Sequence, residues 1–370
     1  MTEEHFIETG KGSFYGEYLY DQVVPKDHFF RKLNELMDWR KYTQKMMRWY
    51  KGRAEYGRPP FDPVVLLKML LVAYLYNLSE RQTEQYINDS MSAKYFLGLG
   101  MDQPAPDHST LTRFKERIIL RRRELKLEAL LTEIVQTALA NGVKFGSIQV
   151  VDSTHSTADV DTWKDAERKS QGKGCRDPHA SWGSKGKKRF KDAHGETHEQ
   201  HKYFYGYKTH VSLNAESGLV TSVTVSSGRA YDGSYLPDLV KADICTGVMV
   251  GVVAADRGYD DSAHHYWLEQ QGIRSAICLK RNRTEKKDAN KEVWLKLKES
   301  ASYRQGLAQR YKVEQKFGEA KRYHGLRRCR YLGLNKYRIQ VVLTVMALNL
   351  KRMVKLVDGV GFRSASPGFA

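Results

Sequence analysis

Residues 147–152 read SIQVVD, and residues 250–256 read VGVVAAD. Each stretch is a short apolar run with the composition of a buried strand, and each ends in an acid, Asp152 or Asp256. In open α/β sheets, ligands bind in the crevice outside the carboxyl ends of the strands. The two runs therefore predict a pair of carboxylates that are held on rigid backbone and point into one crevice.

The sequence around these runs indicates how the sheet is built. The stretch 214–218, NAESG, separates two segments of alternating apolar and polar residues and has the composition of a hairpin turn. The expected elements are alternating strands over 207–214 and 219–227, a helix over 262–271, a strand over 275–280, and helices over 304–323 and 339–353. Antiparallel strands followed by strands that alternate with helices predict an α/β (α+β mixed) fold, in which helices flank a mixed sheet.

Residues 1–140 are expected to form a separate, almost entirely helical domain. The candidate helix starts are Asp62 before Pro63, Ser79 with Gln82 three residues later, and Asp107 or Ser109. These residues supply N-caps, a proline at the first helical position and a capping box. Three short helices with a basic third one are typical of a helix-turn-helix DNA reader, and they fit an ordinary helical bundle equally well.

The chain is strongly basic. Lys and Arg number 61 against 43 Asp and Glu, which leaves a formal net charge of +18 and a pI near 9.5. Such an excess destabilises the chain through self-repulsion, and a polyanionic partner offsets that cost. Nucleic acid is the leading partner class, an anionic membrane surface is the alternative, and a basic face that meets only solvent is the third interpretation.

The cysteines and the apolar segments bear on the compartment. The four cysteines, at 175, 245, 278 and 329, are scattered without a CxxC pair, which favours a reducing compartment over a disulfide framework. The N-terminus lacks the pattern of a signal peptide. Polar residues interrupt the apolar run 339–353, and a membrane span needs about 20 mostly apolar residues. We expect a cytoplasmic protein with no membrane segment.

A third acid, Glu314, completes a candidate metal site. Arg310 lies four residues before Glu314 and Lys321 seven residues after it, which places all three on one face of a helix. Phosphodiester transfer at neutral pH needs an activated water or 3′-OH and a stabilised leaving oxyanion, and two Mg²⁺ ions about 4 Å apart supply both. Mg²⁺ prefers carboxylate oxygens. Asp152, Asp256 and Glu314 are therefore the candidate catalytic and metal-binding residues.

These acids lie in a recognisable pattern. The stretches VVDST (150–154) and ADRGYD (255–260), with the Arg310, Glu314 and Lys321 spacing, resemble the three catalytic blocks of insertion-sequence DDE transposases, particularly the insertion-sequence-five group. Further segments that resemble the group are 61–85, YFYGYKTH (203–210) and KRYHGLRR (321–328). One residue departs from the wider family, which has Tyr three residues before the Arg, where this chain has Leu307.

The resemblance implies an activity and a division of the chain. It implies a helical DNA-binding and dimerisation domain over 1–140, an RNase H-like DDE catalytic domain over 141–355, and a tail over 356–370. The implied reaction is cut-and-paste transposition: a homodimer uses two Mg²⁺ ions, with Mn²⁺ as a possible substitute, to cleave double-stranded DNA at the element ends and to join it to target DNA. The alternatives are a transposase-derived DNA-binding regulator and a stand-alone metal-dependent nuclease.

Two basic segments are expected to contact DNA. Between Arg304 and Arg338, 11 Lys and Arg accompany two acids, and residues 160–202 are rich in Gly, Lys and His. We interpret 160–202 as a long basic loop inserted between the first two strands. The expected contacts are Arg310, Lys321, Arg322, Arg327 and Arg328 in the first segment, and Trp182, Lys185, Lys187, Lys188 and Arg189 in the second. Charge runs that are merely solvated are the alternative.

Two other signals are weaker. Cys175, His179, His194, His198 and His201 contain zinc-ligand residue types, but incidental histidines are favoured because Gly195 interrupts any helix and a second cysteine is lacking. The HxxR sequence at 324–327 is used by tyrosine recombinases, but no matching upstream arginine block is evident. His324 is instead expected to extend the basic helix end toward DNA.

Overall fold

The computed structural model describes residues 6–7, 14–50, 59–191, 195–285 and 290–362. The side chains of residues 14, 15, 187, 188 and 191 lie outside this description. The chain divides into two compact units. One unit comprises Met1–Lys144 with Val342–Ala370, and the other comprises Phe145–Val341. We describe each unit by itself.

The first unit is helical, as expected of the N-terminal region. Its elements are α1 (Phe14–Val23), α2 (Phe29–Leu36), α3 (Trp39–Met46), the 3-10 helix η3 (Met47–Tyr50), α4 (Pro63–Leu75), α5 (Glu80–Asp89), α6 (Met91–Leu97), α7 (His108–Leu120), α8 (Glu128–Ala140) and the C-terminal part of α15 (Leu334–Asp358). Every residue of α4 is buried. This helix is therefore the core around which the unit packs.

Side-chain caps confirm the predicted helix starts. Asp62 accepts a hydrogen bond from the Val64 amide at 2.8 Å, at the start of α4. Ser79 and Gln82 form the capping box of α5. Of the two candidate caps for α7, Asp107 is the one that acts, because its carboxylate accepts from the Ser109 amide at 2.7 Å.

No single described helix is long and apolar enough to span a membrane. By length and composition alone, one pair passes the same test, Pro63–Leu75 with Glu80–Asp89, which is bent by 102° at its break.

The second unit is built on a six-stranded mixed sheet in the order β2-β3-β1-β5-β6, with β4 also paired to β3. Its strands are β1 (Ile148–Thr157), β2 (Ser181–Lys191), β3 (Thr197–Asn214), β4 (Val220–Ser227), β5 (Val252–Ala255) and β6 (Arg274–Ile277). β3 runs antiparallel to β1, β2 and β4, whereas β1, β5 and β6 are parallel. The predicted mixed sheet flanked by helices is confirmed.

The helices of this unit follow the strands in the chain. They are α9 (Thr162–Ser170), η4 (Asp232–Tyr235), α10 (Leu236–Thr246), η5 (Arg257–Tyr259), α11 (Ser262–Gln270), η6 (Arg281–Thr284), α12 (Lys291–Glu299), α13 (Ala301–Ala308), α14 (Tyr311–Tyr323) and the start of α15. The single helix expected over 304–323 is two helices, because the chain turns between α13 and α14.

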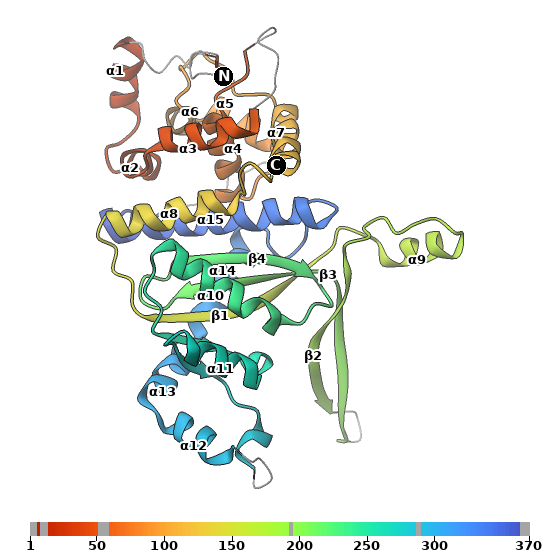
Figure 1. The fold of residues 1–370 in the computed structure, drawn as a ribbon. Coiled ribbons are helices and arrows are strands. Elements are labelled where there is room, and N and C mark those ends of the chain that lie inside the picture. The colour runs from red at the N-terminus through yellow and green to blue at the C-terminus, as the bar shows by residue number, and fades with distance from the viewer. Residues whose placement is uncertain (1–5, 8–13, 51–58, 192–194, 286–289, 363–370) are drawn as a thin grey trace. The chain divides into compact units, whose positions relative to one another are not determined.

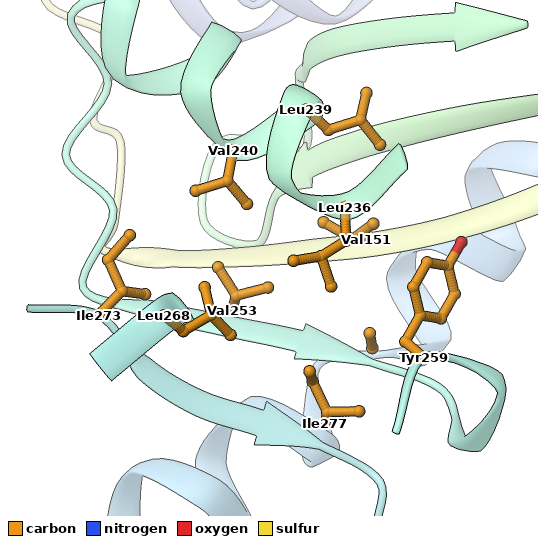
Figure 2. Close-up of a cluster of buried hydrophobic side chains, with 10 residues drawn as sticks. Val151, Leu236, Leu239, Val240, Val253, Tyr259, Leu268, Ile273 and Ile277 are labelled. Atoms are coloured by element: carbon orange, nitrogen blue, oxygen red, sulfur yellow. The ribbon is translucent and has the colours of Figure 1, made fainter. Parts of the chain in front are cut away.

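Alternation along the strands assigns the two faces of the sheet. Val151, Val253 and Ile277 lie in a buried cluster with side chains of α10 and α11, and Tyr259 lies at the edge of that cluster (Figure 2). The intervening residues face the other way. On that opposite face α13 packs against β5 and β6. Gly306 allows the approach, because a Cβ there would collide with Ala276.

The prediction of a long loop over 160–202 is wrong. The segment contains α9, β2 and the start of β3, and the two strands form a hairpin that extends well beyond the rest of the sheet (Figure 1). Buried carboxylates fix its base: Asp165 accepts from the Arg176 amide at 2.8 Å, and Asp177 accepts from the Tyr207 hydroxyl at 2.6 Å. Segment 160–202 has few apolar residues because the outer parts of its two strands are exposed on both faces. The alternation of apolar and polar residues that marks a half-buried strand is therefore missing.

Candidate active site

Two of the predicted acids lie side by side where the parallel pairing of β1 with β5 ends. Asp256 follows the end of β5 as predicted, but Asp152 does not end its strand, because β1 continues to Thr157 in pairing with β3. β1 and β5 pair with Val151 opposite Ala255, so Asp152 and Asp256 are the next residues along each strand direction. Because Val151 and Ala255 belong to the cluster on the α10 and α11 face, both acids are directed to the opposite face. That face is the one covered by α13 and α14.

Backbone amides hold both carboxylates in place. The Ser153 amide donates to Asp152 Oδ1 at 2.7 Å. The Gly258 amide donates to Asp256 Oδ1 at 2.7 Å, so Asp256 caps the short helix η5. One oxygen of each acid is thereby fixed, and the orientation of the head groups is set by the chain itself.

Glu314 reaches the same region from a helix. It lies in the first turn of α14, which packs against β1, and its side chain is exposed. The start of α14 is tied to the sheet by Lys312, whose ammonium donates to the Ala215 carbonyl at 2.6 Å. Arg310 is the residue that precedes the helix.

The electrostatics show that the three acids are neighbours. Burial raises the pKa of Asp152 to about 7, the Ser153 amide opposes this shift, and the Asp256 and Glu314 carboxylates add to it. Arg310 lowers the same pKa. A carboxylate that is penalised by burial and by two like charges is stabilised by any cation that enters among them.

The acids are close but do not form a compact cluster. Within the described part of the chain, the ligand atoms of Asp152, Asp256 and Glu314 do not all lie within 4.8 Å of one another. The group of acids and histidines that meets this criterion is Glu84, Asp107 and His108, in the helical unit. There, His108 Nδ1 lies 2.7 Å from a carboxylate oxygen of Glu84, and both side chains are partly exposed.

A basic cluster, defined by Lys185, Lys321 and Arg327, lies beside the acids. Burial lowers the pKa of Lys321, the positive charges of Lys185 and Arg327 act in the same direction, and Asp152 opposes them. The pKa of His155 is lowered to about 4 by burial and by nearby lysines, Lys321 first. His155 is therefore neutral at physiological pH, and the positive charge here resides on Lys and Arg.

The other predicted DNA contacts are on the surface in varied settings. Arg322 and Arg327 are exposed, and Arg328 pairs with Asp159 at 2.7 Å. On the hairpin, Arg189 pairs with Glu199 at 2.8 Å, and the Trp182 side chain is 58% exposed. Lys187 and Lys188 lie on β2, but their side chains are outside the described set.

Two sequence interpretations are corrected here. The expectation that His324 touches DNA is wrong, because its side chain is completely buried. No zinc cluster forms among the described histidines and cysteines. His198 and His201 point to opposite faces of β3, since their positions on the strand differ by three, an odd number. His194 lies outside the described residues.

Sequence reasoning missed a group of polar residues near the acids. Tyr259 is almost fully buried, and its pKa is raised by burial and by the charges of Asp152, Asp232 and Asp256. Asp232 in turn pairs with Lys208 at 2.8 Å. The sequence did carry a signal for both residues. Tyr259 falls within ADRGYD and Lys208 within YFYGYKTH, two stretches that resemble the transposase group.

Comparison with solved structures finds distant likenesses to transposases. A piggyBac transposase synaptic complex with hairpin DNA is 11% identical, with a TM-score of 0.39, and the match covers 95% of this chain and 79% of that one. The Mos1 strand transfer complex is 10% identical, with a TM-score of 0.20, over 80% of this chain and 97% of that one.

Comparison with protein families is more specific. Residues 18–117 match a family described as "Transposase domain (DUF772)", and residues 144–350 match one described as "Transposase DDE domain". The second match spans more than half of the chain and includes Asp152, Asp256 and Glu314. The chain therefore belongs to the DDE transposase family, whose members are DNA transposases that depend on divalent metal ions to cleave and transfer DNA strands.

Proposed function

We propose that Asp152, Asp256 and Glu314 are the metal-binding and catalytic residues of this transposase. The observation that supports the proposal most is the pairing of β1 with β5, which brings Asp152 and Asp256 to adjacent positions on the same face of the sheet, just beyond the last paired residues. Glu314 adds a third carboxylate from α14, close enough to shift the pKa of Asp152.

The donor set fits Mg²⁺, and we propose two ions. All three ligands offer carboxylate oxygens, which are the donors that Mg²⁺ prefers, and Mn²⁺ accepts the same donors. The raised pKa of Asp152 fits as well, because a bound cation removes the penalty of burial beside two like charges. When bound, the metal ions supply Lewis acidity to the attacking and the leaving oxygen.

The surrounding residues have distinct tasks in this proposal. Lys321 and Arg310 flank the acids and hold the phosphates next to the scissile bond, so that the strand lies over Asp152 and Asp256. The exposed Arg322, Arg327 and Arg328 extend the phosphate track beyond α14. Neutral His155 leaves the positive charge concentrated on Lys185, Lys321 and Arg327.

At the level of the whole protein, we propose cut-and-paste transposition by a homodimer. The helical unit recognises the double-stranded element end and contributes to dimerisation. Water first cleaves the element end, and the freed 3′-OH then attacks target DNA without a covalent protein–DNA intermediate. One active site cannot easily hold both element ends, which favours two copies of the chain.

The decisive experiment incubates the protein with Mg²⁺ and DNA that carries the native element ends, and scores cleavage and strand transfer separately. Asp152→Ala, Asp256→Ala and Glu314→Ala should each abolish both products, while end binding stays nearly unchanged because phosphate contacts supply most of the affinity. Glu319→Gln is the matched control, since Glu319 lies on the same helix and pairs with Lys316.

The outcomes separate the alternatives. Near-normal cleavage by any one of the three acid variants would remove that residue from the metal site. Cleavage without strand-transfer products in the unaltered protein would indicate a nuclease. Loss of end binding in an acid variant would mean that the substitution disturbs the fold or the DNA surface.

A further inference from the structure

The hairpin of β2 and the first part of β3 presents two different faces. The register pairs Trp182 with Tyr205 and Arg189 with Glu199, so these residues share a face with Tyr203. The other face carries Phe204. Phe204 is buried and its ring packs on His155 at 4.7 Å, with the Lys185 ammonium 5.8 Å above it. Phe204 therefore contacts His155 and Lys185, and both of these residues lie near Lys321 of the basic cluster.

The opposite side of the hairpin is an aromatic face, defined by Trp182, His201, Tyr203 and Tyr205. Trp182 and Tyr205 are in ring contact at 5.5 Å, and His201 and Tyr203 stack at 6.0 Å. Trp182 is 58% exposed and Tyr203 is 60% exposed. Contiguous exposed apolar surface of this kind marks an interaction site more often than isolated exposed residues do.

The aromatic face has a rigid base. The Tyr205 hydroxyl donates to the Asp177 carbonyl at 3.2 Å, and the Asp177 carboxylate accepts from the Tyr207 hydroxyl at 2.6 Å. Asp177 and Tyr207 are completely buried. The rings are consequently presented at fixed positions, which lowers the entropy cost of a contact.

The charge of the hairpin favours a nucleic acid on this face. Residues 181–206 contain six Lys and Arg and three Asp and Glu, a net charge of +3. Aromatic rings interleaved with basic residues on a solvent-exposed groove or ribbon bind single-stranded nucleic acid, because every base offers a π-face and every phosphate a charge. Two copies of this face set against each other would both carry positive charge and would repel.

The spacing of the rings favours unpaired over paired nucleotides. Tyr203 and Tyr205 are two residues apart on one strand, so the Cα atoms that carry the two rings are about 6.6 Å apart. Stacked bases in a duplex follow one another every ~3.4 Å along each strand, so two such rings cannot both enter a continuous stack. An extended single strand, whose bases are unstacked, can place bases between and beside the rings.

We propose that the aromatic face of the β2–β3 hairpin binds unpaired nucleotides of single-stranded DNA by stacking, on the face of β3 that continues to Val211, the partner of Asp152. This inference rests on the proposed DNA-strand-cleaving function, because strand cleavage and transfer create unpaired segments next to the cut. The hairpin then serves two strands at once. Phe204 packs beside Lys185 of the basic cluster, and the aromatic face holds a neighbouring unpaired strand.

The test measures the affinity of the full chain for fluorescently labelled oligo-dT of about 15 nucleotides and for a duplex of about 15 base pairs. The double variant Trp182→Ala/Tyr203→Ala should lose at least about tenfold in affinity for oligo-dT, with an unchanged salt dependence, because stacking rather than charge is removed. Duplex affinity should change less than about twofold. The pair Trp182→Phe/Tyr203→Phe should retain most of the oligo-dT affinity, since both rings can still stack.

Trp163→Ala is the matched control, because Trp163 is 86% exposed on α9 and lies outside the aromatic face. Unchanged oligo-dT affinity in the double alanine variant, or an equal loss for both DNAs, would overturn the proposal. A shift from dimer to monomer in sedimentation velocity would overturn it as well and assign the face to a second copy. Duplex end cleavage by the double variant shows independently whether the proposed function stands.

Discussion

The two halves of β3 are one continuous strand in opposite environments. Residues 197–203 are exposed at every position, whereas residues 204–214 are buried or nearly so. In the buried half, Tyr207 stacks on Tyr337 at 4.8 Å and the hydroxyls of Thr209 and Tyr337 lie 2.6 Å apart. The exposed half has the same backbone pairing, but its side chains contact other exposed side chains of the hairpin, as in the pairs Arg189–Glu199 and His201–Tyr203. Packing therefore buries one half, and the other half presents its side chains to solvent.

Three glycines mark the boundary between these halves. Gly206 on β3 pairs with both Thr157 of β1 and Ser181 of β2, and its carbonyl accepts from the Gly228 amide at 2.9 Å. A Cβ on Gly206 would overlap the Ser156 carbonyl oxygen, and one on Gly183 would overlap that of Gly228. The backbones cross so closely here that only glycine fits.

The largest effect should come from this boundary. Gly206→Ala forces the β1 backbone to move, and we expect a loss of at least ~3 kcal/mol in the free energy of unfolding, measured by urea denaturation. Gly186 on the hairpin is the control, because a Cβ there has nothing within 4 Å. Gly186→Ala should cost only ~1 kcal/mol, from its positive φ of 87°. Equal losses would mean that the two halves of the strand do not differ in packing.

The contrast also explains what the sequence could predict. Asp152 and Asp256 were found because each terminates a buried run, where apolar composition and position leave little choice. The hairpin was mistaken for a loop because a strand that is exposed on both faces has no alternation to detect. Glu314 depended on resemblance, since its helix gives no local sign that it packs beside β1.

Contacts across the sheet were beyond sequence reasoning for a different reason. The Lys208 pair with Asp232 and the proximity of Tyr259 to the acids join residues far apart in the chain. Only the folded register brings them together. Alternation can place Lys208 and His210 on one face of β3, but it cannot name their partners.

The next largest effect should appear at the active site, in the packed part of the catalytic unit. Lys321→Ala should lower the cleavage rate about 100-fold, because it removes a charge next to the reacting phosphate, while DNA affinity falls less than about tenfold. The measurement is single-turnover cleavage beside equilibrium binding. Lys316→Ala, on the same helix but paired with Glu319, should leave the rate nearly unchanged. A loss in affinity as large as the loss in rate would make Lys321 a binding residue only.

A smaller effect should appear in the pH dependence of stability. Burial raises the pKa of Asp243 on α10 to about 6, and no hydrogen-bond donor is in bonding geometry with its carboxylate, although the hydroxyls of Ser212, Thr221 and Ser222 lie nearby and oppose the shift. The folded-state pKa of Asp243 exceeds the unfolded value of about 3.9. At a pH below both values, the carboxyl group is neutral in the folded and in the unfolded state. Its ionisation destabilises the fold progressively as the pH rises from about 4 through 6.

Asp243→Asn should therefore stabilise the protein above pH 6, by about 1 to 2 kcal/mol after the cost of a buried amide, and should change little at pH 4. Thermal unfolding across this pH range measures the difference. Asp238→Asn is the control, because Asp238 is exposed on the same helix. A stabilisation that is equal at pH 4 and pH 7 would show that the effect is packing rather than ionisation.

The smallest effect should separate the base of the hairpin from its outer part. Lys185 lies over Phe204 and lowers the pKa of Lys321, so Lys185→Gln should reduce both cleavage and DNA affinity. Arg189 is farther out and pairs with the exposed Glu199, so Arg189→Gln should reduce affinity alone, by less than about tenfold. The slope of the Arg189→Gln variant's affinity against salt concentration should flatten by at most about one unit, the share of a single phosphate contact.

The measurement is affinity against salt concentration, together with the cleavage rate at saturating DNA. If Arg189→Gln slows cleavage as much as Lys185→Gln does, the exposed half of the hairpin acts at the reaction centre after all, and the division of β3 into a packed half and a ligand-binding half fails.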